Sequence, residues 1–315
     1  MTKRQIVTLP EIQAVLPSLD LISAIEAGSA AYSAGQAVVP PVGELLLDKG
    51  EVHIKYGYLR DGAHYVVKIA SGFYDNARLD LPTTNGLMLL FSQQTGQLVT
   101  ILLDEGFLTD TRTAVAGSIA AKYLAPQNVH RIGIVGTGIQ ARLQLQYLQE
   151  ITTCRDVLVW GRGQAQLSQF QRDMEPMEFA ITPAQDAAAV LQTCNLIVTT
   201  TPAASPLLHV ANLQPGTHIT AVGSDTPHKQ ELDSAILGRA DLVVADSIVQ
   251  SLERGEIHHA IKDRQIQADN LLELGHIIAG RSVGRSSEEQ ISVVDLTGVA
   301  VQDIQIANAV TEALA

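Results

Sequence analysis

The stretch RIGIVGTGIQARLQLQYL, residues 131–148, decides the fold of the second half of this chain. It opens with a short apolar run typical of a buried strand, and Gly136, Gly138 and Ala141 then follow in the order G-x-G-x-x-A. The first glycine permits a tight turn, the second lets the backbone approach a pyrophosphate, and the small third residue lets a helix pack on the strand. Because strand, turn and helix are in register, the stretch predicts a dinucleotide-binding turn.

Apolar runs recur on the carboxyl side of this turn, with helix-compatible segments between most of them. Continuous apolar strands that alternate with helices predict a parallel sheet that is covered on both faces. The runs are residues 156–161, 195–201, 217–223 and 241–247. We therefore expect an α/β fold with a Rossmann domain over residues 121–291.

The first part of the chain mixes strand-like runs with turns. Four runs rich in Val, Ile, Leu and Tyr predict strands, the last two as a hairpin: residues 52–59, 64–71, 86–92 and 98–104. An alanine-rich helix is expected over residues 109–125, capped by Thr109 or Asp110. A last strand over residues 291–298 precedes a closing helix, and this end of the chain is expected to fold back toward the first domain.

Composition excludes several classes of protein. The chain has 315 residues, 46% hydrophobic and 17% charged, which argues against disorder. Its formal net charge of -12 disfavours nucleic acid or an anionic membrane as a partner. The two cysteines, Cys154 and Cys194, form no metal-type pair, so no metal site is predicted. The amino terminus has no apolar core of a signal peptide, so we expect a cytoplasmic protein.

The end of the second expected strand of the Rossmann domain distinguishes between cofactors. A site that prefers NAD usually has Asp or Glu there to hold the ribose 2′-hydroxyl. This chain has Trp160, Gly161 and Arg162 instead, and Arg162 can pair with the 2′-phosphate of NADP. The alternative is an exposed arginine in a loop. We expect NADP(H) to be preferred and NAD(H) to be possible.

Three charged residues are candidates for chemistry, and each also has an ordinary structural interpretation. Lys68 lies within an expected strand, where its ammonium could simply reach solvent. Arg112 lies near the start of the alanine-rich helix, where it could be solvated or could bind a carboxylate with its planar guanidinium. Asp225 follows an expected strand at the ligand-binding edge of the sheet, but it could also cap a helix before Pro227.

In combination these segments resemble the ornithine cyclodeaminase/μ-crystallin family from about residue 25 to the carboxyl end. Six motifs carry the resemblance: VVKIASGFYDN (66–76), LPTTNG (81–86), LTDTRTAVAGSIAAKYLA (108–125), IGIVGTGIQARLQL (132–145), AVGSDTPHKQELD (221–233) and VVDLTGVAVQD (293–303). The resemblance implies a homodimer, and an α+β substrate-binding and dimerisation domain over residues 1–120 and 292–315. It also implies an active site between this domain and the Rossmann domain.

The resemblance assigns roles to individual residues. Lys68 looks like the active-site lysine of the family, Arg112 like the arginine that binds the substrate carboxylate, and Asp225 like the acid that handles the amine or the attacking water. Asn76 and Thr84 match positions that line the substrate region. The residues assigned to the cofactor are Thr113, Gly136, Thr137, Gly138, Ile139, Gln140, Ala141, Gly161, Arg162, Thr200 and Val222.

Two departures from the family pattern stand out. Many members have an arginine where this chain has Val42, so one contact to the substrate carboxylate is missing. We hypothesise that Lys55, on a neighbouring strand, replaces that charge. His228 stands where glycine is usual, in the loop beside Asp225.

The motifs imply hydride exchange at an α-carbon that bears nitrogen and a carboxylate. The apparent NADP(H) preference and the missing arginine favour a reductase of a small α-imino acid, either a cyclic ketimine such as pyrroline-2-carboxylate or iminosuccinate. The alternatives are a cyclodeaminase that converts L-ornithine to L-proline and an alanine dehydrogenase-like amino acid dehydrogenase. A more distant alternative is a non-catalytic binding protein similar to μ-crystallin.

Overall fold

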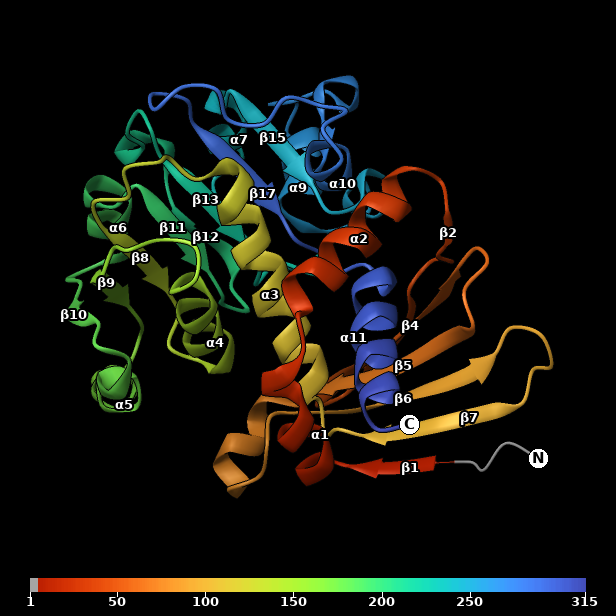
Figure 1. Cartoon of the computed structure of the whole chain (residues 1–315). Helices are drawn as coiled ribbons and strands as arrows, with labels where there is room; N and C mark the ends of the chain where they lie inside the picture. Colours follow the sequence, from red (N-terminus) through yellow and green to blue (C-terminus); the bar gives the residue numbers. More distant parts are fainter. Residues whose placement is uncertain (1–4) are drawn as a thin grey trace. The chain divides into compact units, whose positions relative to one another are not determined.

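The structure is a computed structural model that describes residues 5–315, apart from the side chains of Tyr74 and Ala77. The chain forms two compact units (Figure 1). The first unit consists of the chain up to Arg112 together with Val299–Ala315, and the second unit is Thr113–Gly298.

The unit edges differ from the domain limits expected near residues 120 and 292. Helix α3 (Phe107–Leu124) continues from the first unit into the second without a break, so no turn in the sequence marks the boundary. Strand β17 (Ser292–Asp295) falls within the limits expected for the first domain, but it pairs with strands of the second unit. All four of its residues are buried, as in a central parallel strand.

The first unit is built around one mixed sheet with the strand order β1-β7-β6-β5-β4-β2, and β3 pairs with β4. The four predicted strands are confirmed as β4 to β7, each paired antiparallel with the next. The elements of this unit are β1 (Gln5–Thr8), α1 (Leu9–Val15), η1 (Leu16–Ser18), α2 (Leu21–Ser33), β2 (Ala37–Val38), β3 (Gly43–Leu47), β4 (Gly50–Leu59), β5 (His64–Gly72), η2 (Tyr74–Leu79), β6 (Thr84–Ser92), β7 (Leu98–Leu103) and α11 (Ala300–Ala313).

One face of this sheet is buried and the other is open. Alternate side chains of a strand point to opposite faces. Helix α11 packs on β4 and β5, and Lys55 and Lys68 are buried on the face that it covers. The opposite face carries apolar side chains that stay partly exposed, including Val67 and Leu89, which are register partners.

Helix α3 starts earlier than the sequence indicated. It begins at Phe107, ahead of both expected capping residues, Thr109 and Asp110. The carboxylate of Asp104 instead accepts a hydrogen bond from the backbone N–H of Leu108 at 2.8 Å. The capping prediction was therefore wrong. The buried carboxylate of Asp104, four residues before Leu108, accepts the hydrogen bond from the first turn of the helix.

The second unit contains a parallel sheet with the order β10-β9-β8-β11-β13-β17-β15-β16. The expected strands at residues 131–136, 156–161, 195–201, 217–223 and 241–247 are confirmed as β8, β9, β11, β13 and β15. The elements are β8 (Ile132–Val135), α4 (Ile139–Leu148), β9 (Asp156–Trp160), α5 (Gln164–Met174), η3 (Glu175–Met177), β10 (Ala180–Pro183), α6 (Ala187–Thr193), β11 (Leu196–Thr199), β12 (Ala204–Leu208), η4 (Val210–Asn212), β13 (His218–Ala221), β14 (Gln230–Leu232), α7 (Ser234–Arg239), β15 (Leu242–Ala245), α8 (Ile248–Ser251), α9 (Gly255–Lys262), η5 (Ala268–Asn270), β16 (Leu272–Glu273) and α10 (Leu274–Ile278).

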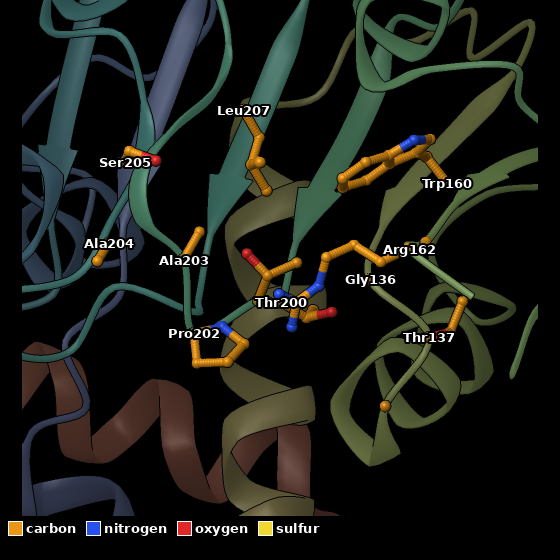
Figure 2. Close-up of a pocket in the computed structure, with 13 residues that line it drawn as sticks. Gly136, Thr137, Trp160, Arg162, Thr200, Pro202, Ala203, Ala204, Ser205 and Leu207 are labelled. Atoms are coloured by element: carbon orange, nitrogen blue, oxygen red, sulfur yellow. The ribbon is translucent and has the colours of Figure 1, made fainter. Parts of the chain in front are cut away.

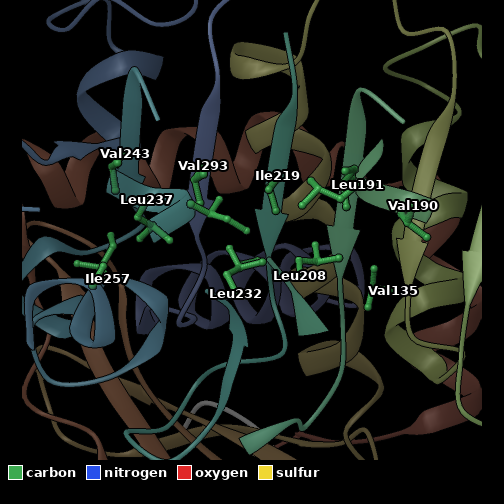
Figure 3. Close-up of a cluster of buried hydrophobic side chains, with 14 of the residues drawn as sticks. Val135, Val190, Leu191, Leu208, Ile219, Leu232, Leu237, Val243, Ile257 and Val293 are labelled. Atoms are coloured by element: carbon green, nitrogen blue, oxygen red, sulfur yellow. The ribbon is translucent and has the colours of Figure 1, made fainter. Parts of the chain in front are cut away.

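The order of the strands places a ligand site in this unit. The chain leaves β8 for β9 on one side and later returns to β11 on the other side of β8. Ligands of open parallel sheets bind beyond the carboxyl ends of the strands where the order reverses in this way. One side of the sheet is closed by a cluster of buried aliphatic side chains that includes Val135, Leu191, Ile219 and Val293 (Figure 3).

Within residues 5–315, no single helix combines the length and the apolar content needed to cross a bilayer. The segments Leu9–Ser18 and Leu21–Ser33 meet that criterion only as a pair, and they are bent by 90° relative to each other. Ile12 and Ile25, one from each segment, are buried in the core of the protein.

Candidate functional site

The glycine-rich turn after β8 has the conformation that the sequence predicted. Gly136 has a φ of 122°, and a Cβ at this position would collide with the hydroxyl of Thr200. A Cβ on Gly138 would meet no atom within 4 Å, so space for a ligand lies directly beside the backbone. Gly138 is also the N-cap of α4, whose first N–H groups point out of the helix end. The turn therefore fits a pyrophosphate.

An arginine that the sequence analysis missed holds this turn in place. Arg142 donates hydrogen bonds from Nη1 to the carbonyl oxygens of Thr137 and Gly138, and from Nε to the carboxylate of Asp173 at 2.8 Å. Because these carbonyl oxygens are occupied by Arg142, the N–H groups of the same turn are the ones presented to a ligand. The position of Arg142 on the first turn of α4 is the feature of the sequence from which this role could have been predicted.

A pocket of about 410 Å³ opens beside the turn (Figure 2). It lies at the carboxyl ends of β8, β9 and β11, and the side chain of Arg162 extends across it in the view of Figure 2. Six of the eleven residues assigned to the cofactor line it: Gly136, Thr137, Gly138, Gly161, Arg162 and Thr200. The lining residues that we did not assign are Trp160, Thr201, Pro202, Ala203, Ala204, Ser205 and Leu207.

The other five residues assigned to the cofactor are not among those that line this pocket. Ala141 is completely buried, which fits the predicted packing of helix on strand, whereas Ile139 is 50% exposed. Gln140 follows in the first turn of α4. The carbonyl of Thr113 accepts a hydrogen bond from Gln144 at 3.1 Å, and Val222 directly follows β13 and is buried.

Three cations of the first unit surround one buried carboxylate. Lys55 and Lys68 are register partners on β4 and β5, so their side chains leave the sheet on the same face. Arg112 donates from Nε to Asp303 Oδ1 at 2.8 Å and from Nη1 to Gln302 Oε1 at 2.9 Å. Lys68 Nζ lies 3.5 Å from Asp303 Oδ2. The sequence predicted the three cations, but it gave no sign that α11 supplies Asp303 and Gln302.

The charges of the three cations act on the carboxyl of Asp303. Burial by itself raises the pKa of the Asp303 carboxyl, but the charges of Arg112, Lys68 and Lys55 outweigh burial and hold that pKa below its ordinary value. Lys68 is only 2% exposed and Arg112 only 4%. Asp104 is a second buried acid within the influence of Lys68, and burial raises its pKa. With both carboxyls ionised, the formal charges of these five side chains sum to +1.

Asn76 and Thr84 lie in the segment that joins β5 and β6. Asn76 is part of η2, and its side-chain amide donates to the carbonyl of Pro82 at 2.9 Å. Thr84 is the register partner of Gly72, four residues along β5 from Lys68. Substrate binding by Asn76 and Thr84 remains a prediction.

Asp225 lies in the loop after β13 and forms an ion pair with Lys229 Nζ at 2.8 Å. The chain continues from Pro227 into strand β14, so Asp225 is not a helix cap. The guanidinium of Arg254 donates to the backbone carbonyl of Asp225 at 3.4 Å. His228 is exposed in the same loop. The carboxylate thus sits at the ligand-binding edge of the sheet, where the sequence analysis expected it.

The second unit is a Rossmann dinucleotide-binding fold by its strand order, its glycine turn and its pocket. The model of the ornithine cyclodeaminase/mu-crystallin family matches residues 2–315, and the chain belongs to that family. Among curated relatives, the uncharacterized cyclodeaminase y4tK of Sinorhizobium fredii is 41% identical over 98% of this chain and 95% of its own length. The iminosuccinate reductase of Paracoccus denitrificans is 31% identical over 99% of this chain and 95% of its own length.

Solved structures agree with this assignment. An archaeal alanine dehydrogenase dimer with bound NAD has a TM-score of 0.90 and 32% identity, over 98% of this chain and 95% of the other. The Thermococcus litoralis Δ1-pyrroline-2-carboxylate reductase in complex with NADH and L-proline has a TM-score of 0.91 and 25% identity, over 98% and 97% of the two chains. The chain is therefore similar to enzymes that bind NAD or NADH. Among residues 5–315, no three His, Cys, Asp or Glu side chains are grouped to hold a metal ion.

The cation cluster predicts a large cost for removing its anion. Asp303→Asn leaves Arg112, Lys68 and Lys55 buried without that charge, so we expect the free energy of unfolding to fall by about 3–5 kcal/mol. Urea denaturation measures this. Asp156→Asn is the control, because its ion pair with Arg131 is 42% and 35% exposed and should contribute no more than about 1 kcal/mol. Equal losses in the two variants would contradict the proposed importance of the buried cluster.

Proposed function

We propose that this protein is an NAD(P)H-dependent reductase that converts a small α-imino acid to the L-amino acid. The observation that carries the proposal is the buried group of Lys55, Lys68 and Arg112 around Asp303, in a chain that also has a dinucleotide pocket. Relatives named as an iminosuccinate reductase and a pyrroline-2-carboxylate reductase support the reaction class.

Each charged residue has a distinct part in the proposed reaction. Nε and Nη1 of Arg112 are held by Asp303 and Gln302, so the plane of the guanidinium is fixed and Nη2 is proposed to donate to the substrate carboxylate. The ammonium of Lys68 stabilises negative charge or relays a proton. Asp225 is proposed to keep the imine nitrogen protonated, which makes the imine carbon more electrophilic. The dinucleotide supplies the hydride when it is bound.

The charge of the site favours an acidic imino acid over a diamino acid. The distal ammonium of L-ornithine would be brought close to the three buried cations Lys55, Lys68 and Arg112, whose charges act on Asp303. Like charges that lie close together repel strongly when they are shielded from water. A second carboxylate, as in iminosuccinate, would be attracted instead. We therefore prefer reduction to cyclodeamination, although a relative bears the name of a cyclodeaminase.

The test follows oxidation of NADPH or NADH, by its absorbance, with iminosuccinate generated from oxaloacetate and ammonia, and with Δ1-pyrroline-2-carboxylate. We expect turnover of an imino acid and no ammonia release from L-ornithine. In Lys55→Met, the KM of the dicarboxylic imine should rise about tenfold, because a charge-assisted contact is lost. Lys55→Arg retains the charge and serves as the control. Ammonia release from L-ornithine without any imine reduction would overturn the proposal.

We also propose that NADP(H) is preferred to NAD(H). Arg162 is exposed at the pocket, and the chain has no acid directly beside it to hold a ribose 2′-hydroxyl. The neighbours described above bind NAD or NADH, so this preference would set the chain apart from them.

Replacing Arg162 should change the cofactor preference selectively. In Arg162→Ala, the dissociation constant of NADPH should rise about tenfold or more while that of NADH stays within twofold, because only NADPH carries the 2′-phosphate. Isothermal titration with both cofactors measures this. Arg172→Ala, an exposed arginine on α5, is the control. If NADPH and NADH weaken equally, Arg162 does not bind the 2′-phosphate.

The open face of the first sheet supports the homodimer that the family resemblance implies. Its positions are apolar along three neighbouring strands, and Tyr65 and Phe91 stack on it with ring centroids 4.9 Å apart. Tyr56 on the same face is 38% exposed. Contiguous exposed apolar surface of this kind marks an interaction site. We propose that a second copy of this chain covers it, as the alanine dehydrogenase neighbour is also a dimer.

A charge in the middle of this face should prevent assembly. We expect the wild type to sediment as a dimer and Leu89→Asp as a monomer, because an aspartate would have to be desolvated in the interface. Analytical ultracentrifugation gives the masses. Val249→Asp is the control, since Val249 is 72% exposed on α8 of the second unit. A monomeric wild type would refute the proposed interface.

A further inference from the structure

Two segments of the second unit converge on one buried carboxylate, that of Glu231 on β14. One oxygen, Oε1, accepts hydrogen bonds from the backbone N–H of Thr201 at 2.6 Å and from its hydroxyl at 2.8 Å. The other, Oε2, accepts from the hydroxyl of Thr199 at 2.7 Å and from the backbone N–H of Gly223 at 2.9 Å. Glu231 is completely buried and belongs to none of the groups already described.

The first segment bound by Glu231 forms a wall of the dinucleotide pocket. Thr201 lines that pocket, and so do the residues that follow it into β12. Strand β12 pairs with β14, and the backbone N–H of Gln230 donates to the carbonyl of Ala203 at 2.7 Å. The position of this wall therefore depends on β14 and on the side chain at its centre.

The second segment leads to Asp225. Gly223 approaches Thr201 and Glu231 so closely that an added Cβ would lie 2.6 Å from Glu231 Oε2 and would also collide with the backbone of Thr201. Asp225 is only two residues further along the chain. A single carboxylate thus fixes the spacing between the loop that lines the pocket and the loop that carries the proposed acid.

Strand β14 is itself held from the opposite side. The carboxylate of Glu256 accepts hydrogen bonds from the backbone N–H groups of Glu231 at 2.7 Å and of Leu232 at 3.1 Å. Burial raises the pKa of Glu231 to about 7, although its hydrogen bonds to Thr199, Thr201 and Gly223 lower it. A carboxylate kept in such an unfavourable environment is a candidate for a functional role.

We propose that Glu231 is a positioning residue, which sets the pocket wall at Thr199–Thr201 and the loop of Asp225 with the two oxygens of one carboxylate. This inference rests on the proposed function of the pocket as a dinucleotide site. Glu231 does not itself line the pocket, so its effect reaches a dinucleotide through Thr201 and its effect on the reaction through Asp225.

Glu231→Gln tests the proposal with little change in volume. In either orientation of the new amide, its NH2 faces a backbone N–H, that of Thr201 or that of Gly223, so one donor loses its acceptor. We expect the dissociation constant of NADH to rise about tenfold. Trp160 is the single tryptophan of the chain and lines the pocket, so quenching of its fluorescence reports binding. The midpoint of thermal unfolding is measured in parallel.

Glu256→Gln is the matched control. It removes an equally buried charge that bonds the backbone of β14 but touches neither loop, so it should lower the midpoint of unfolding and weaken NADH binding clearly less than Glu231→Gln does. Gly223→Ala is the second variant, in case Glu231→Gln does not fold. Its added methyl forces Thr201 and the retained Glu231 carboxylate away from Gly223, and it should weaken NADH binding to a similar extent.

The outcomes distinguish this inference from the proposed function. If the wild type does not bind NADH or NADPH, the dinucleotide site itself is refuted. If the wild type binds and both Glu231→Gln and Gly223→Ala bind equally well, Glu231 has no positioning role. If Glu256→Gln weakens binding as much as the other two variants, the effect is one of general stability, and the inference fails as well.

Discussion

The first unit depends on the interaction of Asp303 with the cations around it. A buried guanidinium and buried ammonium groups are costly unless a carboxylate and further hydrogen bonds accompany them. Helix α11 provides that carboxylate, together with the amide of Gln302 that completes the partners of Arg112. The same helix covers one face of the sheet, so the packing of the unit and the charge balance of the proposed site rest on one element. A change in the packing of α11 would therefore also change the charge balance of the proposed site.

Elements that depend on local patterns were predictable from the sequence. Apolar runs bounded by turn residues gave the parallel strands of the second unit, and G-x-G-x-x-A gave the turn whose φ at Gly136 only glycine adopts readily. The candidate site was predicted unevenly. Lys68 and Arg112 were identified by resemblance to a family, since a lysine in a strand or an arginine in a helix is ordinary on its own. Lys55 was identified through a departure from that family's pattern, and the structure places it beside Lys68.

Partners that are distant in sequence were not predictable. Asp303 lies 191 residues from Arg112. The periodicity of the sequence identifies it only as one polar residue of the closing helix. Glu231 looks like a polar residue of a short strand until the loops at Thr199–Thr201 and Gly223 are brought to it. The limits of the two units differ from the expected domain limits for a related reason. Helix α3 crosses the boundary without a turn, and the strand assignment of residues 292–295 required knowledge of its neighbours.

The discontinuity of the first unit has a consequence for biosynthesis. Thr113–Gly298 leave the ribosome as one continuous segment, so the second unit can collapse while translation proceeds. Helix α11 follows the second unit in the sequence, so Lys68 and Arg112 meet the carboxylate of Asp303 only after that unit has been synthesised. Until that point, the face of the sheet that α11 covers lacks this helix. The first unit can therefore complete its packing only after the second unit has been synthesised.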